Sequence, residues 1–118
     1  MMNCLLPVLL LVPTLAITLT APTKAQLTYA DVKPIFQRRC AGCHTGPHAQ
    51  KGLDLSTYAG IIGGNKSGKI LIPSKPTQSR ILKLMKGTAK PIMPPIAPRA
   101  TSAEISTIYE WIKQGAKK

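Results

Sequence analysis

The feature that most constrains this chain is the pentapeptide Cys40-Ala41-Gly42-Cys43-His44, which reads C-x-x-C-H. This spacing is typical of covalent haem attachment, because two thiols three positions apart can each add to one of the two vinyl groups of the macrocycle. A histidine directly after the second thiol lies beneath the iron, where an imidazole nitrogen can bind it. The pattern therefore predicts thioether bonds from Cys40 and Cys43, with His44 as an axial ligand.

The beginning of the 118-residue chain has the features of an export signal. An almost wholly apolar run from Leu5 to Leu19 is followed by the small residues of Thr23-Lys24-Ala25. This order predicts that residues 1–25 are removed as a signal peptide and that one domain, 26–118, works in the periplasm. No Lys or Arg precedes the run, so retention as a membrane anchor is the alternative. Two prolines interrupt the run, however, and it is shorter than the roughly 20 residues that span a bilayer.

The cysteine count supports haem attachment over other uses of the motif. Loss of the signal peptide would also remove Cys4 and leave Cys40 and Cys43 as the only thiols, too few for a disulfide framework. A thioredoxin-type dithiol would lie between a strand and a helix, whereas here a helical pattern precedes the motif and a glycine-rich stretch follows it. A zinc-binding interaction module is a further alternative, with these two thiols, His44 and His48 as ligands. Its four ligands would lie much closer together in the sequence than in the usual zinc sites, where two separate pairs of ligands bind the metal.

The net charge of +12, with only four acidic residues, favours acidic partner proteins and makes association sensitive to salt. Nucleic acid is a weaker alternative, because the lysines are scattered and no recognition helix or aromatic platform is visible. We therefore expect acidic docking surfaces on the partners and no nucleic-acid binding.

Hydrophobic spacing predicts an all-α domain with three to four short helices and long loops. Helices are expected over 27–40, 77–86 and 102–114, with mostly loop over 45–68, which holds too many glycines for a regular element, and a proline-rich loop over 88–100. The residues predicted to form the buried helix faces are Ile35, Phe36, Ile81, Leu82, Leu84, Met85, Ile105, Ile108, Trp111 and Ile112.

Capping residues mark the helix starts and ends. Thr101 with Glu104 has capping-box spacing, and so has Thr28 with Asp31. If Asp31 is the N-cap of the first helix, Pro34 lies in the first turn and is tolerated. A start at Thr28 would instead force a kink at Pro34. Either Thr77 or Ser79 is expected to cap the middle helix, which Gly87 ends.

A histidine-bound haem iron needs a second axial ligand or an open site. The candidates are Met93, Met85 and His48. Met85 shares an apolar helix face with Ile81 and Leu82, which favours core packing, and His48 follows His44 too closely to reach the opposite face of the ring. Met93 lies in a loop that Pro94 and Pro95 stiffen, and a stiff loop can hold a thioether at low entropic cost. Met93 is therefore the favoured ligand, with burial in the core as its other interpretation.

The segment Gly63-Gly64-Asn65-Lys66-Ser67-Gly68-Lys69 matches the G-x-x-x-x-G-K part of a phosphate-binding loop. That loop needs Ser or Thr next and then a helix. Here Ile70 follows and Pro73 prevents the helix, so nucleotide binding is not expected.

Taken together, the chain resembles the small class I-type cytochrome c domain, especially the bacterial form found alone or fused to larger oxidoreductases. The residues that carry the resemblance are Val32-Lys33-Pro34-Ile35-Phe36, Cys40-x-x-Cys43-His44, Gly52-Leu53-Asp54-Leu55, Gly63-Gly64, Ile72-Pro73-x-x-Pro76, Ser79-Arg80-Ile81-Leu82, Met93-Pro94-Pro95, Glu104-Ile105 and Trp111-Ile112-x-x-Gly115-Ala116. One departure is that Ser74 and Lys75 stand between Pro73 and Pro76, where the family often has Gly, which puts the local turn type in doubt.

The resemblance implies a cytochrome c fold wrapped around one covalently bound haem c, with Cys40 and Cys43 as thioether anchors and His44 and Met93 as axial ligands. It also implies that the first helix packs on the last, with Phe36 against Trp111 and Ile108. The expected function is electron transfer between redox partner proteins. With both axial positions filled, the protein would not be an enzyme by itself. An open-site haem protein, peroxidase-like or gas-sensing, is the alternative if Met93 dissociates.

Overall fold

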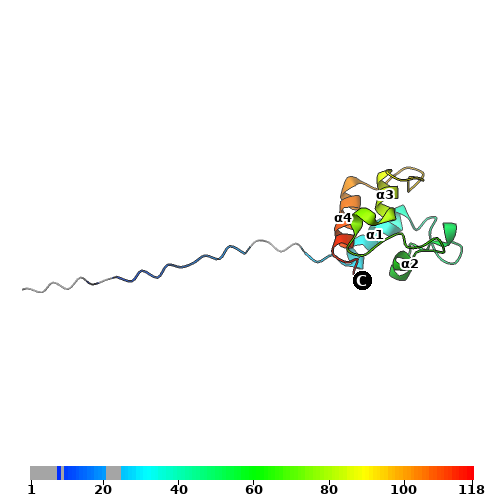
Figure 1. Ribbon diagram of the computed structural model, residues 1–118. Coiled ribbons are helices and arrows are strands. Elements are labelled where there is room, and N and C mark those ends of the chain that lie inside the picture. The colour runs from blue at the N-terminus through cyan, green and yellow to red at the C-terminus, as the bar shows by residue number, and fades with distance from the viewer. Residues whose placement is uncertain (1–7, 9, 21–24) are drawn as a thin grey trace, which may run out of the picture.

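The computed structural model describes residues 8, 10–20 and 25–118. Cys4 and the first two residues of the predicted Thr23-Lys24-Ala25 cleavage motif lie outside the described residues. Residues 10–20 have no regular secondary structure and extend away from the helices (Figure 1), and their large apolar side chains are exposed. No helix in the described part of the chain is both long and apolar enough to cross a membrane.

Residues 25–118 fold into short helices joined by long loops, as the all-α prediction requires. In chain order the elements are α1 (Tyr29–Arg39), the 3-10 helix η1 (Gln50–Gly52), α2 (Tyr58–Gly63), the 3-10 helix η2 (Pro76–Gln78), α3 (Arg80–Lys86) and α4 (Ser102–Lys113). Within residues 25–118 the only strand-like pairing is an isolated bridge from Asn65 to Gly68. The expected helix at 77–86 therefore begins as η2 and continues as α3.

Helix α1 begins at the capping residues that the sequence indicated, with one correction. Thr28 is the N-cap, and its backbone N–H donates to the Asp31 carboxylate at 2.7 Å. Asp31 is thus not the N-cap, and Pro34 lies inside the helix rather than in its first turn. The helix nevertheless continues to Arg39, because packing of Val32, Ile35 and Phe36 in the core outweighs the one backbone hydrogen bond that a proline removes.

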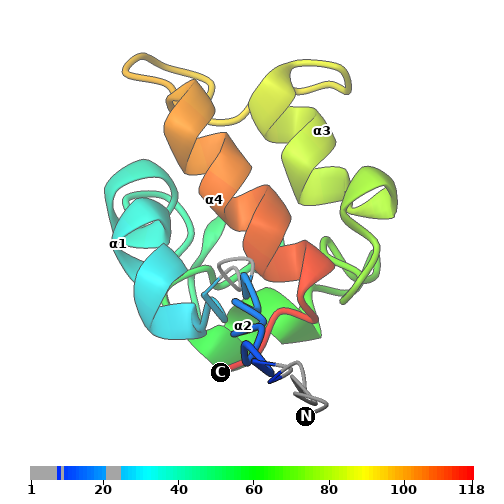
Figure 2. The same ribbon diagram turned by 90° about the vertical axis from the view of Figure 1, so that its left-hand side faces the viewer.

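Helix α4 is the centre of the packing and lies between α1 and α3 in Figure 2. Its Thr101–Glu104 capping box is present as predicted. Trp111 is completely buried, and its ring meets Phe36 of α1 edge-on, with the centroids 6.2 Å apart. Ile108 and Ile112 are also fully buried, whereas Ile105 is only partly so, which corrects the predicted stripe at its N-terminal end.

The prediction that 45–68 is mostly loop, with too many glycines for a regular element, is wrong for the stretch that forms α2 (Tyr58–Gly63). Glycines there suggested irregular backbone, but Gly60 serves close packing. A Cβ at Gly60 would lie 2.1 Å from the backbone oxygen of Asp54. Only glycine therefore lets α2 pack this closely against the backbone at Asp54. The hydroxyl of Thr57 caps α2 by accepting from the Gly60 N–H at 3.0 Å. A residue that local sequence patterns treat as a helix breaker is therefore required by a tertiary contact.

The turn before α3 is unusual at two serines. Ser79 occupies the N-cap position of α3, but its buried hydroxyl donates to the Lys75 carbonyl at 2.9 Å and accepts from the Ile72 N–H at 3.0 Å instead of capping the helix. Ser74 has φ +67°, the left-handed region that favours glycine. The resembled family often has Gly between the two prolines of this turn. Ser74 stands there and adopts a backbone conformation that favours glycine. Gly87 ends α3 with φ +77°, as expected.

The proline-rich segment 88–100 has no helix or strand, which agrees with the prediction. It leaves the end of α3 and returns to the start of α4. The backbone N–H of Met93 donates to the Leu84 carbonyl at 3.0 Å, which fixes the middle of this loop against α3.

Candidate functional site

One cavity of about 770 Å³ unites the residues singled out from the sequence. Cys40, Cys43 and His44 line it from the turn after α1, and Met93 lines it from the proline-rich loop. The remaining apolar lining residues are Leu53, Leu55, Ile70, Ile81, Leu84, Met85, Pro91, Pro94 and Pro95. Its volume lies within the range of about 300 to 1,000 Å³ that is usual for small-molecule and cofactor sites.

The C-x-x-C-H turn continues directly from the C-terminus of α1. Cys40 is the C-cap of that helix, and its carbonyl accepts from the His44 N–H at 3.0 Å and from the Cys43 N–H at 3.2 Å. These bonds form a compact turn that places both thiols and the imidazole on the lining of one cavity. Cys43 is exposed, whereas burial raises the pKa of the Cys40 thiol to about 11. Both cysteines are free thiols, with no disulfide between them.

The imidazole of His44 is held in an orientation suited to metal binding. Its Nδ1 lies 3.1 Å from the carbonyl oxygen of Gln50 and 3.1 Å from that of Leu53. Both neighbours are acceptors, so Nδ1 carries the proton and donates, and Nε2 is left with its lone pair. A histidine that donates its other ring N–H to a carbonyl is the usual arrangement of a metal-bound imidazole.

The sequence did not place these two carbonyl partners. Backbone acceptors leave no side-chain pattern to detect, and Gln50 is brought to His44 by η1, a 3-10 turn that the glycine-rich segment concealed. The same segment is tied back to the motif by two further bonds, from the Gln50 N–H to the Cys43 carbonyl at 3.0 Å and from the Leu55 N–H to the His44 carbonyl at 2.8 Å.

The three candidates for the second ligand differ in position. Met93 is partly buried and lines the cavity. Met85 also lines it, but only 5% of its surface is exposed and it packs in the hydrophobic core, as its helix position predicted. His48 is exposed and is absent from the cavity lining. The structure thus brings Met93 to the same cavity as His44 and leaves His48 outside it.

Glu104 joins the end of α1 to the start of α4 beside the cavity. Its carboxylate accepts from the guanidinium of Arg39 at 2.9 Å and from that of Arg38 at 3.0 Å, and the Thr101 N–H donates to it at 2.9 Å. These donors, Arg39 first, lower the pKa of Glu104 to about 2. Arg38 and Arg39 immediately precede Cys40, so this ion-pair cluster fixes the helix end that carries the motif.

The donor set and cavity walls fit a covalently bound haem. Two thiols and one imidazole with a free Nε2 lie in one turn, a thioether sulfur comes from a separate loop, and the walls between them are largely apolar. Sulfur and imidazole nitrogen are the usual ligand atoms of low-spin haem iron, and an apolar wall excludes water from the ring.

The other uses of the motif find less support in the geometry. Within the described residues, no group of three or more His, Cys, Asp or Glu side chains is arranged to hold a metal ion, so His48 does not complete a zinc cluster with the motif. The G-x-x-x-x-G-K segment starts at the last residue of α2 and turns at the Asn65–Gly68 bridge, and no helix begins directly after Lys69.

Comparison with known proteins gave one match. Residues 40–96 match the family described as Planctomycete cytochrome C, over a little under half of the chain. The matched stretch includes Cys40, Cys43, His44 and Met93 and omits both α1 and α4. No curated protein and no solved structure matches the chain. The match, with four short α-helices and almost no strand in the described residues, supports a cytochrome c-type domain and so suggests covalent haem c.

Proposed function

We propose that the protein is a mono-haem c-type cytochrome that carries electrons between redox partners, with His44 and Met93 as axial ligands and Cys40 and Cys43 as thioether anchors. The observation that carries this proposal is the single cavity lined by all four side chains, in which the His44 Nδ1 is already engaged by two backbone carbonyls. Haem bound there would supply a one-electron ferric/ferrous couple.

The residues of the chain would tune that couple in separate ways. The two thiols hold the ring at the end of α1. His44, oriented by the carbonyls of Gln50 and Leu53, would supply Nε2 to the iron, and Met93, which lies on the separate proline-rich loop, would supply its sulfur. His/Met ligation favours the reduced iron and raises its potential. With both axial positions filled the protein would have no catalytic activity by itself.

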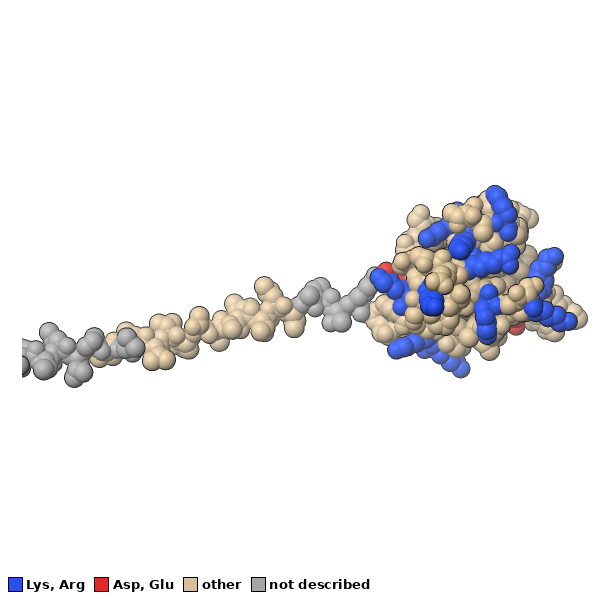
Figure 3. Space-filling view, in the orientation of Figure 1, with Lys and Arg blue, Asp and Glu red and all other residues tan. Residues whose placement is uncertain are grey.

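The surface and the N-terminal segment suggest where the carrier works. Lys and Arg side chains are spread over the face shown in Figure 3, where few acidic groups are visible. Such a surface accelerates encounters with acidic partners at low ionic strength. We infer export to the periplasm with removal of residues 1–25, since c-type haem is normally attached outside the cytoplasm; retention of that segment would instead give a membrane-anchored form.

The deciding experiment is the visible spectrum of the protein expressed in a periplasm with haem-attachment machinery. We expect wild type to be red, to keep its haem after acid–acetone extraction and to exclude carbon monoxide in the reduced state. Met93→Ala should keep the covalent haem but bind carbon monoxide, because the thioether no longer occupies the iron.

Met85→Leu is the matched control, because it removes the other cavity thioether with little change of volume; it should behave as wild type. A colourless protein would overturn the haem assignment. A Met93→Ala spectrum identical to wild type would overturn the ligand, and carbon monoxide binding by wild type would favour an open-site haem protein.

A further inference from the structure

The cavity lining is cationic as well as apolar. The positively charged residues on it are Arg38, Arg39, Lys51, Lys69 and Arg80, and among the described residues that line it there is no Asp or Glu. Arg38, Lys51, Lys69 and Arg80 are exposed and Arg39 is half-buried, so their charges together create a positive potential at the rim of the cavity, which favours a negatively charged group there. The bound group should therefore carry negative charge, which for haem means its two propionate carboxylates.

Most of these cations already have partners within the chain. Arg38 and Arg39 donate to Glu104, and the Lys69 ammonium donates to the Ile62 carbonyl at 3.1 Å. In the described part of the chain, the Arg80 guanidinium has neither a hydrogen-bond acceptor nor an ion-pair partner, and the same holds for the Lys51 ammonium. Of these two, arginine presents the planar fork that matches a carboxylate with two parallel hydrogen bonds.

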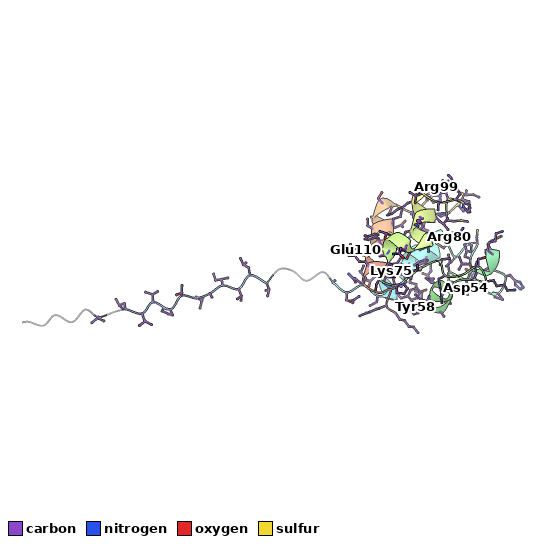
Figure 4. All side chains as sticks on the ribbon, in the orientation of Figure 1. Asp54, Tyr58, Lys75, Arg80, Arg99 and Glu110 are labelled. Carbon is purple, nitrogen blue, oxygen red and sulfur yellow. The ribbon has the colours of Figure 1, made fainter. Side chains whose placement is uncertain are left out.

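The position of Arg80 is also right for this role. The vinyl groups and the propionates occupy opposite edges of haem, so carboxylates belong on a wall that carries neither thiol. Arg80 is the first residue of α3, and the next residue, Ile81, donates its backbone N–H to the Ile70 carbonyl at 2.9 Å. That bond places Arg80 beside the 65–70 turn, a part of the cavity lining that carries neither thiol, and Figure 4 shows Arg80 below Arg99 of the proline-rich loop.

The geometry points to Arg80 as the residue that binds a haem propionate, an inference that rests on the haem function proposed above. Its guanidinium pairs with one carboxylate, and Lys69 adds positive potential at the same wall. The pairing fixes the ring edge remote from the thioether bonds. A positive charge on the cavity lining would also favour the reduced state of a haem bound there.

The test compares Arg80→Gln, Arg80→Lys and Arg99→Gln in the haem-loaded protein. Arg99 is exposed, does not line the cavity and has no partner among the described residues, so its substitution removes the same charge elsewhere. The readouts are the resonance Raman frequency of the propionate bending mode and the midpoint potential. We expect Arg80→Gln to shift the Raman band and to lower the potential by more than Arg99→Gln does, with partial recovery of both in Arg80→Lys.

The outcomes separate this inference from the proposed function. If wild type binds covalent haem but Arg80→Gln and Arg99→Gln have the same Raman band and the same potential, Arg80 does not bind a propionate although the cytochrome assignment stands. If wild type holds no haem at all, the proposed function itself fails. Unfolding of each variant by denaturant, followed by the haem spectrum, shows whether an altered band reflects loss of structure: equal midpoints with a shifted band would support the pairing.

Discussion

The two walls of the cavity are built differently. The His44 wall is dense in hydrogen bonds: the imidazole Nδ1 meets two carbonyls, the His44 backbone is bonded at both its N–H and its carbonyl, and Gln50 is bonded to Cys43. The Met93 wall has far fewer: within residues 90–99 the bonds of the described chain are one from the Met93 N–H to Leu84 and one that the Pro98 carbonyl accepts from Arg39. His44, one proposed ligand, is thus positioned by a network of hydrogen bonds, and Met93, the other proposed ligand, by a proline-stiffened loop.

This difference predicts unequal consequences of damage. Loss of a contact behind His44 should destabilise the fold as well as the site, because the same bonds serve both. Loss of stiffness around Met93 should leave the fold nearly intact and change mainly the access to iron. Three substitutions, each paired with a second variant, test this contrast below, from the largest expected effect to the smallest.

The His44 wall depends on the approach of α2 at Gly60. Gly60→Ala should lower the free energy of unfolding by about 3 kcal/mol, because the new Cβ would overlap the Asp54 carbonyl. The backbone at Asp54 would have to shift, and with it Leu53 and Leu55, which form hydrogen bonds to His44. Denaturant unfolding of the haem protein measures the change.

Gly63→Ala is the matched control, since a Cβ there meets no atom within 4 Å. It should change stability by less than about 1 kcal/mol, in the direction of stabilisation. Equal effects of the two substitutions would show that α2 does not support the His44 wall.

The Glu104 cluster spans both walls, because Arg39 donates to Glu104 and also, at 3.3 Å, to the Pro98 carbonyl. Glu104→Gln should cost about 2 kcal/mol at neutral pH, since it removes the charge that satisfies two guanidinium groups and an N-cap. The pKa of Glu104 falls from 4.5 to about 2 on folding. A lowered pKa stabilises the folded state fully above about pH 4.5, and this stabilisation is lost as the pH falls through about 2.

The deficit of Glu104→Gln should therefore be largest at pH 7 and shrink as the pH falls from 4.5 toward 2. Unfolding midpoints of both proteins across this range provide the measurement. Arg39→Gln should weaken the same acid dependence, because Arg39 is the principal cause of the shift. A deficit that stays constant down to pH 2 would mean that the carboxylate is not paired in solution.

The sequence predicted the His44 wall and the Met93 wall to different extents for a physical reason. The motif and the Thr101–Glu104 cap can be recognised because these residue types at this spacing have few other uses, whereas the packing of Phe36 on Trp111 was implied by the family resemblance. Helix α2 and the carbonyl partners of His44 were missed, because backbone acceptors and a glycine required by a close approach look like loop in a single sequence. That the Arg80 guanidinium has no partner in the described part of the chain could not be predicted either, because this requires the side-chain contacts of the folded protein. Burial of Met93 in the same cavity as His44 emerges only from the path of residues 88–100 in space.

The Met93 wall should respond to loss of stiffness through ligand access. Pro95 is exposed and lines the cavity two residues after Met93. Pro95→Ala should cost no more than about 1 kcal/mol of stability, because its main effect is to increase the entropy of the unfolded chain. Since the loop then samples more conformations, the Met93 sulfur should leave the iron more often, and reduced protein should bind carbon monoxide faster than wild type.

Pro47→Ala separates loop stiffness from global stability. Pro47 is also exposed, but it lies in the loop that follows His44 and is absent from the cavity lining. It should lower stability by a similar amount and leave carbon monoxide binding unchanged, because His44 is held by Gln50 and Leu53 rather than by the prolines. If both variants bound carbon monoxide at the same rate, global stability rather than local stiffness would control the Met93 ligand, and the contrast between the two walls would not hold.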